Sequence, residues 1–219
     1  MKKIAMFAVC IAAVACLALC LGACSKKSQE PVLLGGWTLA DSPAVTDEVQ
    51  GLMDKALEGF AGARYIPAAY VASQVVAGTN HLLVCRVAPV IPDAVETWAL
   101  VTLYQDPQNE VTISDVKDSG VRTYMDANGL VGSWAAPESP AITKDLAKLF
   151  ENATKDLTDA KIAPVALLAT QVVSGTNYLV LASVTPTDGS DAEPHFALVT
   201  VYANLQGNAS ITGNVDFAE

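Results

Sequence analysis

Two stretches of the chain carry apolar residues at the three- and four-residue spacing of an amphipathic helix. One runs from Val45 to Phe60 and the other from Ile142 to Leu157, each with polar residues between the apolar ones. Such a stripe indicates a helix that buries one face. Ser42-Pro43 and Ser139-Pro140 precede the two stretches and suit a helix cap followed by proline at the first helical position. We therefore expect two helices, each covering an apolar surface.

Most of the remaining sequence is typical of β-strands. His81–Val87 and Trp98–Leu103 are rich in β-branched, aromatic and other apolar residues. Alternate positions of the first strand, including Cys85, are expected to face the helix as core residues, because the other set includes the charged Arg86. Turn-forming residues follow at 106–109. One helix with about four strands predicts an α+β fold, in which an antiparallel sheet packs on the helix.

The chain repeats itself. Gln-Val-Val-Ala-Gly-Thr-Asn-His at 74–81 returns as Gln-Val-Val-Ser-Gly-Thr-Asn-Tyr at 171–178. Further matches at this offset are Trp37 with Trp134, Pro67 with Pro164 and, after one inserted residue, 99–104 with 197–202. The repeat is too long, and has too few copies, for a solenoid. It predicts two copies of one domain in tandem, at residues 35–125 and 126–219.

The first residues have the features of an export signal. Lys2 and Lys3 precede an uncharged apolar run that ends in small residues before Cys24. This pattern resembles the bacterial lipoprotein signal, whose cysteine receives a lipid and becomes the first residue of the mature chain. The resemblance implies a signal peptide at residues 1–23, lipidation of Cys24, a tether at 24–34 and anchoring to a bacterial membrane or cell surface. An uncleaved anchor or an ordinary signal peptide would also export the chain.

Charge and cysteine content narrow the range of partners. The formal net charge is −10, and removal of the signal peptide takes away Lys2 and Lys3, which leaves a mature charge of about −12. A field of that sign repels phosphate backbones and argues against nucleic-acid binding. After Cys24 only Cys85 remains, so neither an intrachain disulfide nor a cysteine metal site is expected in the mature chain.

The repeated octapeptide predicts a hairpin, because glycine between two valine-rich segments tolerates the positive φ of a tight turn. Duplication of a structural hairpin would explain the repeat without any function. However, side chains alternate along a strand, so two adjacent valines cannot both point inward. One valine at each tip must face solvent, and an exposed apolar tip often marks a contact site.

The residues around this hairpin resemble the cystatins. Gln74–Gly78 is similar to their first binding loop, and Gly35-Gly36, the helix, the apolar strand and the short turn at 106–110 follow in the family's order. The short turn and the absence of disulfides are most similar to the stefin branch. The resemblance covers nearly the whole chain after the export signal, twice. It implies two tandem cystatin-like domains, each with one helix packed on a four- to five-stranded antiparallel sheet.

The resemblance also implies a function: reversible inhibition of papain-like cysteine proteases at the cell surface, by occlusion of the active site. The binding residues implied for the first copy are Gly35, Gly36, Gln74, Val75, Val76, Ala77, Gly78, Asp106 and Pro107. Those implied for the second copy are Gly132, Gln171, Val172, Val173, Ser174, Gly175, Leu205, Gln206 and Gly207. Because a short tether leaves little room for a protease beside the membrane, a non-inhibitory surface-anchored binding or adhesion module is the alternative.

The sequence gives little indication of catalysis, and we expect no enzyme, no cofactor and no metal site. His81 matches Tyr178 of the other copy, which favours an aromatic residue of the sheet, and His195 lies in a turn-rich stretch expected to be a solvated loop. No spacing suggests a metal pair, a nucleophile elbow or a phosphate loop. Asp188, Asp191 and Glu193 are expected to form a solvated acidic loop, with weak calcium binding as the alternative.

Overall fold

The computed structural model describes residues 33–34, 36–91, 95–123, 125, 132–187, 189 and 193–217. The predicted signal peptide and its lipidation site Cys24 lie outside these residues, as do Gly35, Asp188 and Asp191. The predicted tether is described only at 33–34. Among the described helices, none has the length and apolar character needed to cross a membrane.

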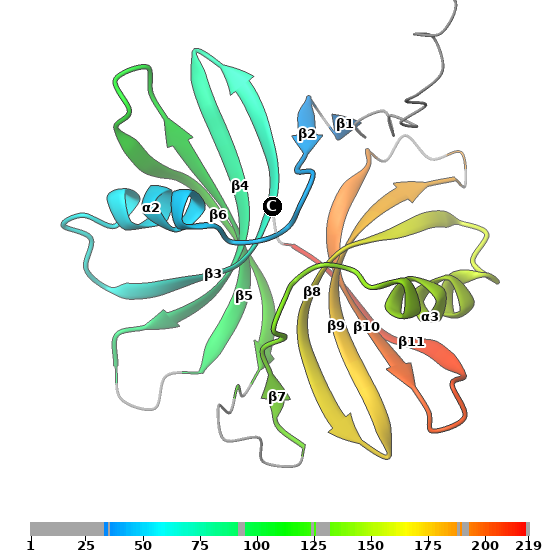
Figure 1. The fold of residues 1–219 in the computed structure, drawn as a ribbon. Helices are drawn as coiled ribbons and strands as arrows, with labels where there is room; N and C mark the ends of the chain where they lie inside the picture. The colour runs from blue at the N-terminus through cyan, green and yellow to red at the C-terminus, as the bar shows by residue number, and fades with distance from the viewer. Residues whose placement is uncertain are drawn as a thin grey trace, which may run out of the picture. The chain divides into compact units, whose positions relative to one another are not determined.

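Each copy of the repeat builds one antiparallel sheet (Figure 1). The first sheet has six strands in the order of the chain: β1 (Leu33–Leu34), β2 (Trp37–Leu39), β3 (Ala63–Val76), β4 (Gly78–Pro89), β5 (Glu96–Gln105) and β6 (Val111–Thr123). The second sheet has five: β7 (Trp134–Ala135), β8 (Ala160–Val173), β9 (Gly175–Pro186), β10 (His195–Ala203) and β11 (Ala209–Asp216).

The two described helices are short and begin later than the Ser-Pro pairs predict. They are α2 (Asp47–Ala56) and α3 (Lys144–Thr154). Each begins after a threonine whose hydroxyl accepts a hydrogen bond from a first-turn amide, 3.3 Å from Val49 N and 3.2 Å from Leu146 N. Proline does not start either helix, because the carbonyls of both Ser-Pro prolines instead accept hydrogen bonds from strand amides of β3 and β8.

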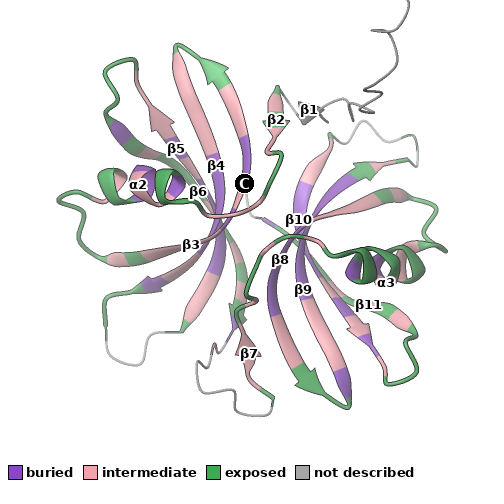
Figure 2. Ribbon diagram, in the orientation of Figure 1, coloured by how far each residue is buried: buried purple, intermediate pink, exposed green. Residues whose placement is uncertain are grey.

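The largest core cluster lies between the two sheets. It joins side chains from β3, β4 and β5 to side chains from β8, β9 and β10, with Val84, Trp98 and Leu181 fully buried. Two smaller clusters lie on the opposite faces, where α2 packs on the first sheet and α3 on the second. Figure 2 shows the buried segments concentrated in the middle of the long strands. Cys85 is fully buried in the α2 cluster, which confirms its predicted place in the core.

The predicted fold class, two tandem cystatin-like α+β domains, is wrong. The described chain is mostly β-strand, with helices of only 10 and 11 residues, and its main core is shared between the sheets. Residues 32–219 form one compact unit. The physical reason is that each central strand is apolar on both faces. A short helix can bury only one face of a sheet, so the other face must find a second apolar surface.

Apolar residues at both sets of alternate positions along β4 already indicated that both faces of this strand are buried. Leu83 and Cys85 face α2 as predicted, but their neighbours Leu82 and Val84 are equally apolar and face the second sheet. Arg86, whose charge suggested a solvated face, forms an ion pair with Glu96 at 2.9 Å. One paired charge at the end of an otherwise apolar row was therefore a poor guide to the whole face.

Because the core is shared, we expect residues 33–217 to unfold in a single cooperative transition. Leu181→Ala, at a fully buried position between the sheets, should lower the free energy of unfolding by about 2 to 5 kcal/mol. Denaturant unfolding followed by circular dichroism and by tryptophan fluorescence would measure both effects. Val90→Ala, at an exposed valine that follows β4, is the control and should change the stability by less than about 0.5 kcal/mol. Two separate transitions, of which Leu181→Ala shifts only one, would contradict the shared core.

Candidate functional site

The candidate site is the end of each sheet at which the octapeptide turns. In the first sheet, β3 and β4 pair up to Val76 and Gly78, so that Ala77 alone forms the tip. Val75 is 85% exposed and Val76 is 46% exposed. In Figure 2 the ends of β3 and β8 are exposed, as the adjoining turns are. Both valines of the tip are thus available to a partner, where the sequence required only one.

The second copy repeats this arrangement. Val173 pairs with Gly175, and Ser174 forms the tip. Val172 is 62% exposed and Val173 is 42% exposed. The two hairpins therefore present the same apolar pair, and differ at the tip only by alanine in one and serine in the other.

The glycine of the octapeptide is required by its surroundings. Gly78 has φ of +143° and Gly175 has φ of +134°. A Cβ at Gly78 would collide with the carbonyl oxygen of Gln105 and with the ring of Tyr104, and a Cβ at Gly175 would make the matching collisions in the second copy. The close approach lets the Tyr104 hydroxyl donate a hydrogen bond to the carbonyl of Ala77, at 2.8 Å.

The tyrosines are positioning residues that sequence reasoning missed. Tyr202 donates to the carbonyl of Ser174 in the second copy, as Tyr104 does to Ala77 in the first. Each tyrosine holds the turn from the neighbouring strand, so the tip is supported on one side by a fixed aromatic ring. The repeat contains both residues at matching positions, and that correspondence was the signal that could have identified them.

The glutamine and asparagine of the octapeptide tie the hairpin together. Asn80 Nδ2 donates to Gln74 Oε1 at 2.9 Å across the strand pair, and Asn177 donates to Gln171 at 2.7 Å. Gln171 Nε2 also donates to the carbonyl of Gly132 at 2.8 Å. These bonds hold each hairpin and join the second hairpin to the segment before β7, and none of them involves the valines.

The three segments predicted to bind a protease come together at each sheet end. Gly132 is bonded to Gln171, and a Cβ at Gly36 would lie 3.3 Å from the side-chain nitrogen of Gln74. The second turn follows Gln105, which pairs with Thr79 beside the first tip. Only Gly35 cannot be placed, because it lies outside the described residues.

The second turns differ in chemistry between the copies. In the first copy Asp106 Oδ1 accepts hydrogen bonds from the amides of Gln108 and Glu110, at 2.8 and 2.9 Å. Pro107 is exposed in this turn. In the second copy Asn204 replaces the aspartate and accepts equivalent bonds from Gln206 and Asn208, each at 3.0 Å. Leu205 is 80% exposed, so this turn of the second copy offers an apolar side chain and no formal charge.

Each histidine lies within hydrogen-bonding distance of side chains on neighbouring strands. Nδ1 of His81 lies 2.9 Å from the Tyr70 hydroxyl and Nε2 lies 3.2 Å from Gln105 Oε1, within the first sheet. Burial raises the pKa of the Tyr70 phenol. His195 begins β10, although a loop was expected, and its Nε2 lies 3.2 Å from Asp216 Oδ1. In the described part of the chain, no three histidine, cysteine, aspartate or glutamate side chains gather as a metal site would require.

Comparison of the chain with protein-family models found no match, and comparison with curated proteins found none either.

Gly78→Ala should destabilise the protein, because the added Cβ meets a backbone carbonyl at a φ that alanine avoids. We expect a loss of more than about 1 kcal/mol in the free energy of unfolding. Gly51→Ala is the matched control, since Gly51 lies inside α2 and a Cβ there meets no atom within 4 Å. It should stabilise the protein by about 0.5 to 1 kcal/mol. Equal effects of the two substitutions in urea unfolding would show that the hairpin glycine is not required.

Proposed function

We propose that this protein is a non-enzymatic binding protein that inserts its apolar hairpin tips into the cleft of a partner, and that papain-like cysteine proteases are the partner class. The observation that carries the proposal is the exposure of paired valines on tips that a tyrosine hydrogen bond and a glutamine–asparagine hydrogen bond hold in place. Binding would block access to the active site without any reactive group. The resemblance of Gln74–Gly78 to an inhibitory loop supplies the class of the partner.

Preorganisation supports this function. Association costs free energy because mobile side chains and loops must be ordered. Here the tip is held by glycine geometry, a tyrosine hydrogen bond and a glutamine–asparagine pair. Valine also loses few rotamers on burial because it is branched at Cβ. Most of the apolar area that enters a cleft would therefore contribute to affinity.

The second copy is the better candidate for the tighter contact. Its turn next to the tip exposes Leu205 and carries no charge, whereas the matching turn of the first copy carries Asp106 and Glu110. A charge buried in an apolar cleft costs desolvation energy. We infer that the end of the second sheet, with Gln171–Gly175 and Leu205–Gly207, makes the larger contribution to binding.

The place of action belongs to the same proposal. The pattern ahead of Cys24 favours export and attachment of a lipid at that cysteine. The chain would then meet its partner protease outside the cytoplasm, at a bacterial membrane or cell surface. A soluble chain that starts at residue 25 retains every described residue and suits the binding experiments.

Inhibition of papain by this soluble chain tests the proposal. Replacing Val172 and Val173 by aspartate should weaken inhibition at least about a hundredfold, because two buried apolar contacts become unpaired charges. The same change at Val75 and Val76 should have a smaller effect. Both variants should keep wild-type thermal stability, since these side chains are exposed.

Val90→Asp is the matched control for the tip variants. Val90 is 71% exposed and follows the end of β4 remote from its hairpin tip. This variant should inhibit papain as the unmodified chain does. Absence of papain inhibition by the unmodified chain at micromolar concentration would reject the protease proposal and leave a non-inhibitory binding module. Equal losses from Val90→Asp and from the tip variants would show that the tips are not the contact.

A further inference from the structure

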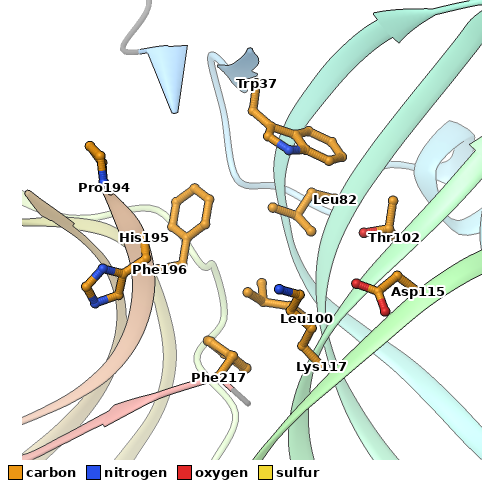
Figure 3. A pocket seen from close by; sticks show the side chains of 10 residues that line it. All are labelled: Trp37, Leu82, Leu100, Thr102, Asp115, Lys117, Pro194, His195, Phe196 and Phe217. Carbon is orange, nitrogen blue, oxygen red and sulfur yellow. The ribbon is translucent and has the colours of Figure 1, made fainter. Parts of the chain in front are cut away.

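A partly open cavity of about 340 Å³ lies between the two sheets, and none of the hairpin-tip residues lines it (Figure 3). Trp37, Leu82 and Leu100 form its wall on the first sheet, and Phe196 and Phe217 form its wall on the second. In Figure 3 the indole of Trp37 and the ring of Phe196 stand on opposite sides of the opening. The lining also includes the polar residues Thr102, Asp115, Lys117 and His195. A pocket of this volume, with apolar walls and a few polar groups, has the size of a small-molecule site.

The corresponding residues of the other copy are more deeply buried. The repeat aligns Phe196 with Trp98, which is fully buried and whose Nε1 donates to Thr123 Oγ1 at 2.9 Å. The leucines there, Leu179 and Leu198, are 2% and 1% exposed, whereas Leu82 and Leu100 of the cavity are both 7% exposed. The edge of the core that carries the tryptophan is therefore more closed than the edge that carries the smaller phenylalanine.

The open edge also carries a charge that the closed edge lacks. Lys117 pairs with Leu100 in the sheet register, and its counterpart beside Leu198 is Val215. In Figure 3 the ammonium of Lys117 points along Leu100 toward the space between the sheets. Among the described residues, no carboxylate pairs with Lys117 and no hydrogen-bond acceptor reaches it. A half-buried, unpaired ammonium beside apolar walls favours an anionic ligand group.

We propose that this cavity binds a small molecule with an apolar body and one carboxylate. The body fills the space between Trp37 and the two phenylalanines, and the carboxylate pairs with Lys117. Asp115, an exposed residue that also lines the cavity from β6, opposes negative charge in the cavity, so a ligand with more than one anionic group is disfavoured most. This site is separate from the hairpin tips, so the proposal holds whether or not the chain inhibits a protease.

Decanoate and decanol are suitable probes, because they share an alkyl chain and differ in charge. We expect saturable binding of decanoate to the chain from residue 25 onward, measured by calorimetry and by the shift of the Trp37 indole N–H signal in NMR spectra. Lys117→Met keeps the apolar stem and should weaken decanoate binding about tenfold or more. The same substitution should leave the weaker binding of decanol unchanged. Lys161→Met, at an exposed lysine of β8, is the matched control.

Phe196→Trp provides a second test, because it copies the residue that closes the other edge. It should abolish decanoate binding while the circular dichroism spectrum and unfolding transition remain those of a folded protein. The proposal is overturned if the unmodified chain shows no saturable binding of decanoate up to the millimolar range. It is equally overturned if decanol binds as tightly as decanoate, or if Lys117→Met and Lys161→Met have the same affinity.

Discussion

Burial of two apolar sheet faces against each other is the constraint on which this structure depends. Val84, Trp98 and Leu181 belong to the cluster that joins the sheets, and none of them is exposed. A sheet exposing such a face would present an apolar patch larger than soluble monomers tolerate. The short helices cover only the outer faces of the sheets. Each copy of the repeat therefore needs the other copy to bury the inner apolar face of its sheet.

The hairpin tips divide their residues into two kinds. Glycine, glutamine, asparagine and the supporting tyrosine determine the shape of the turn through hydrogen bonds and close backbone approach. The valines make none of these contacts and are free to meet another molecule. A rigid turn that carries exposed apolar side chains is suited to recognition, because its shape does not change when those side chains are buried.

The sequence predicted the local features better than their assembly. The repeat, two amphipathic helices, the hairpins and the core position of Cys85 followed from spacing and from the chemistry of glycine, since these depend on near neighbours. The shared core did not follow, because Arg86 suggested a solvated face and its ion pair with Glu96 forms only once β4 and β5 lie side by side. The predicted helix starts were wrong because Thr46 and Thr143 cap the helices, and the Ser-Pro pairs do not. The supporting role of Tyr104 required knowledge of which strand lies beside the turn.

The buried thiol of Cys85 provides a way to measure how often this fold opens. Cys85 is the free cysteine of the described chain, and burial raises its pKa, so the reactive thiolate is suppressed while the α2 cluster is intact. An added thiol reagent can reach this sulfur only after the helix separates from the sheet. The rate of labelling would therefore report how often the first half of the molecule opens, without any introduced probe.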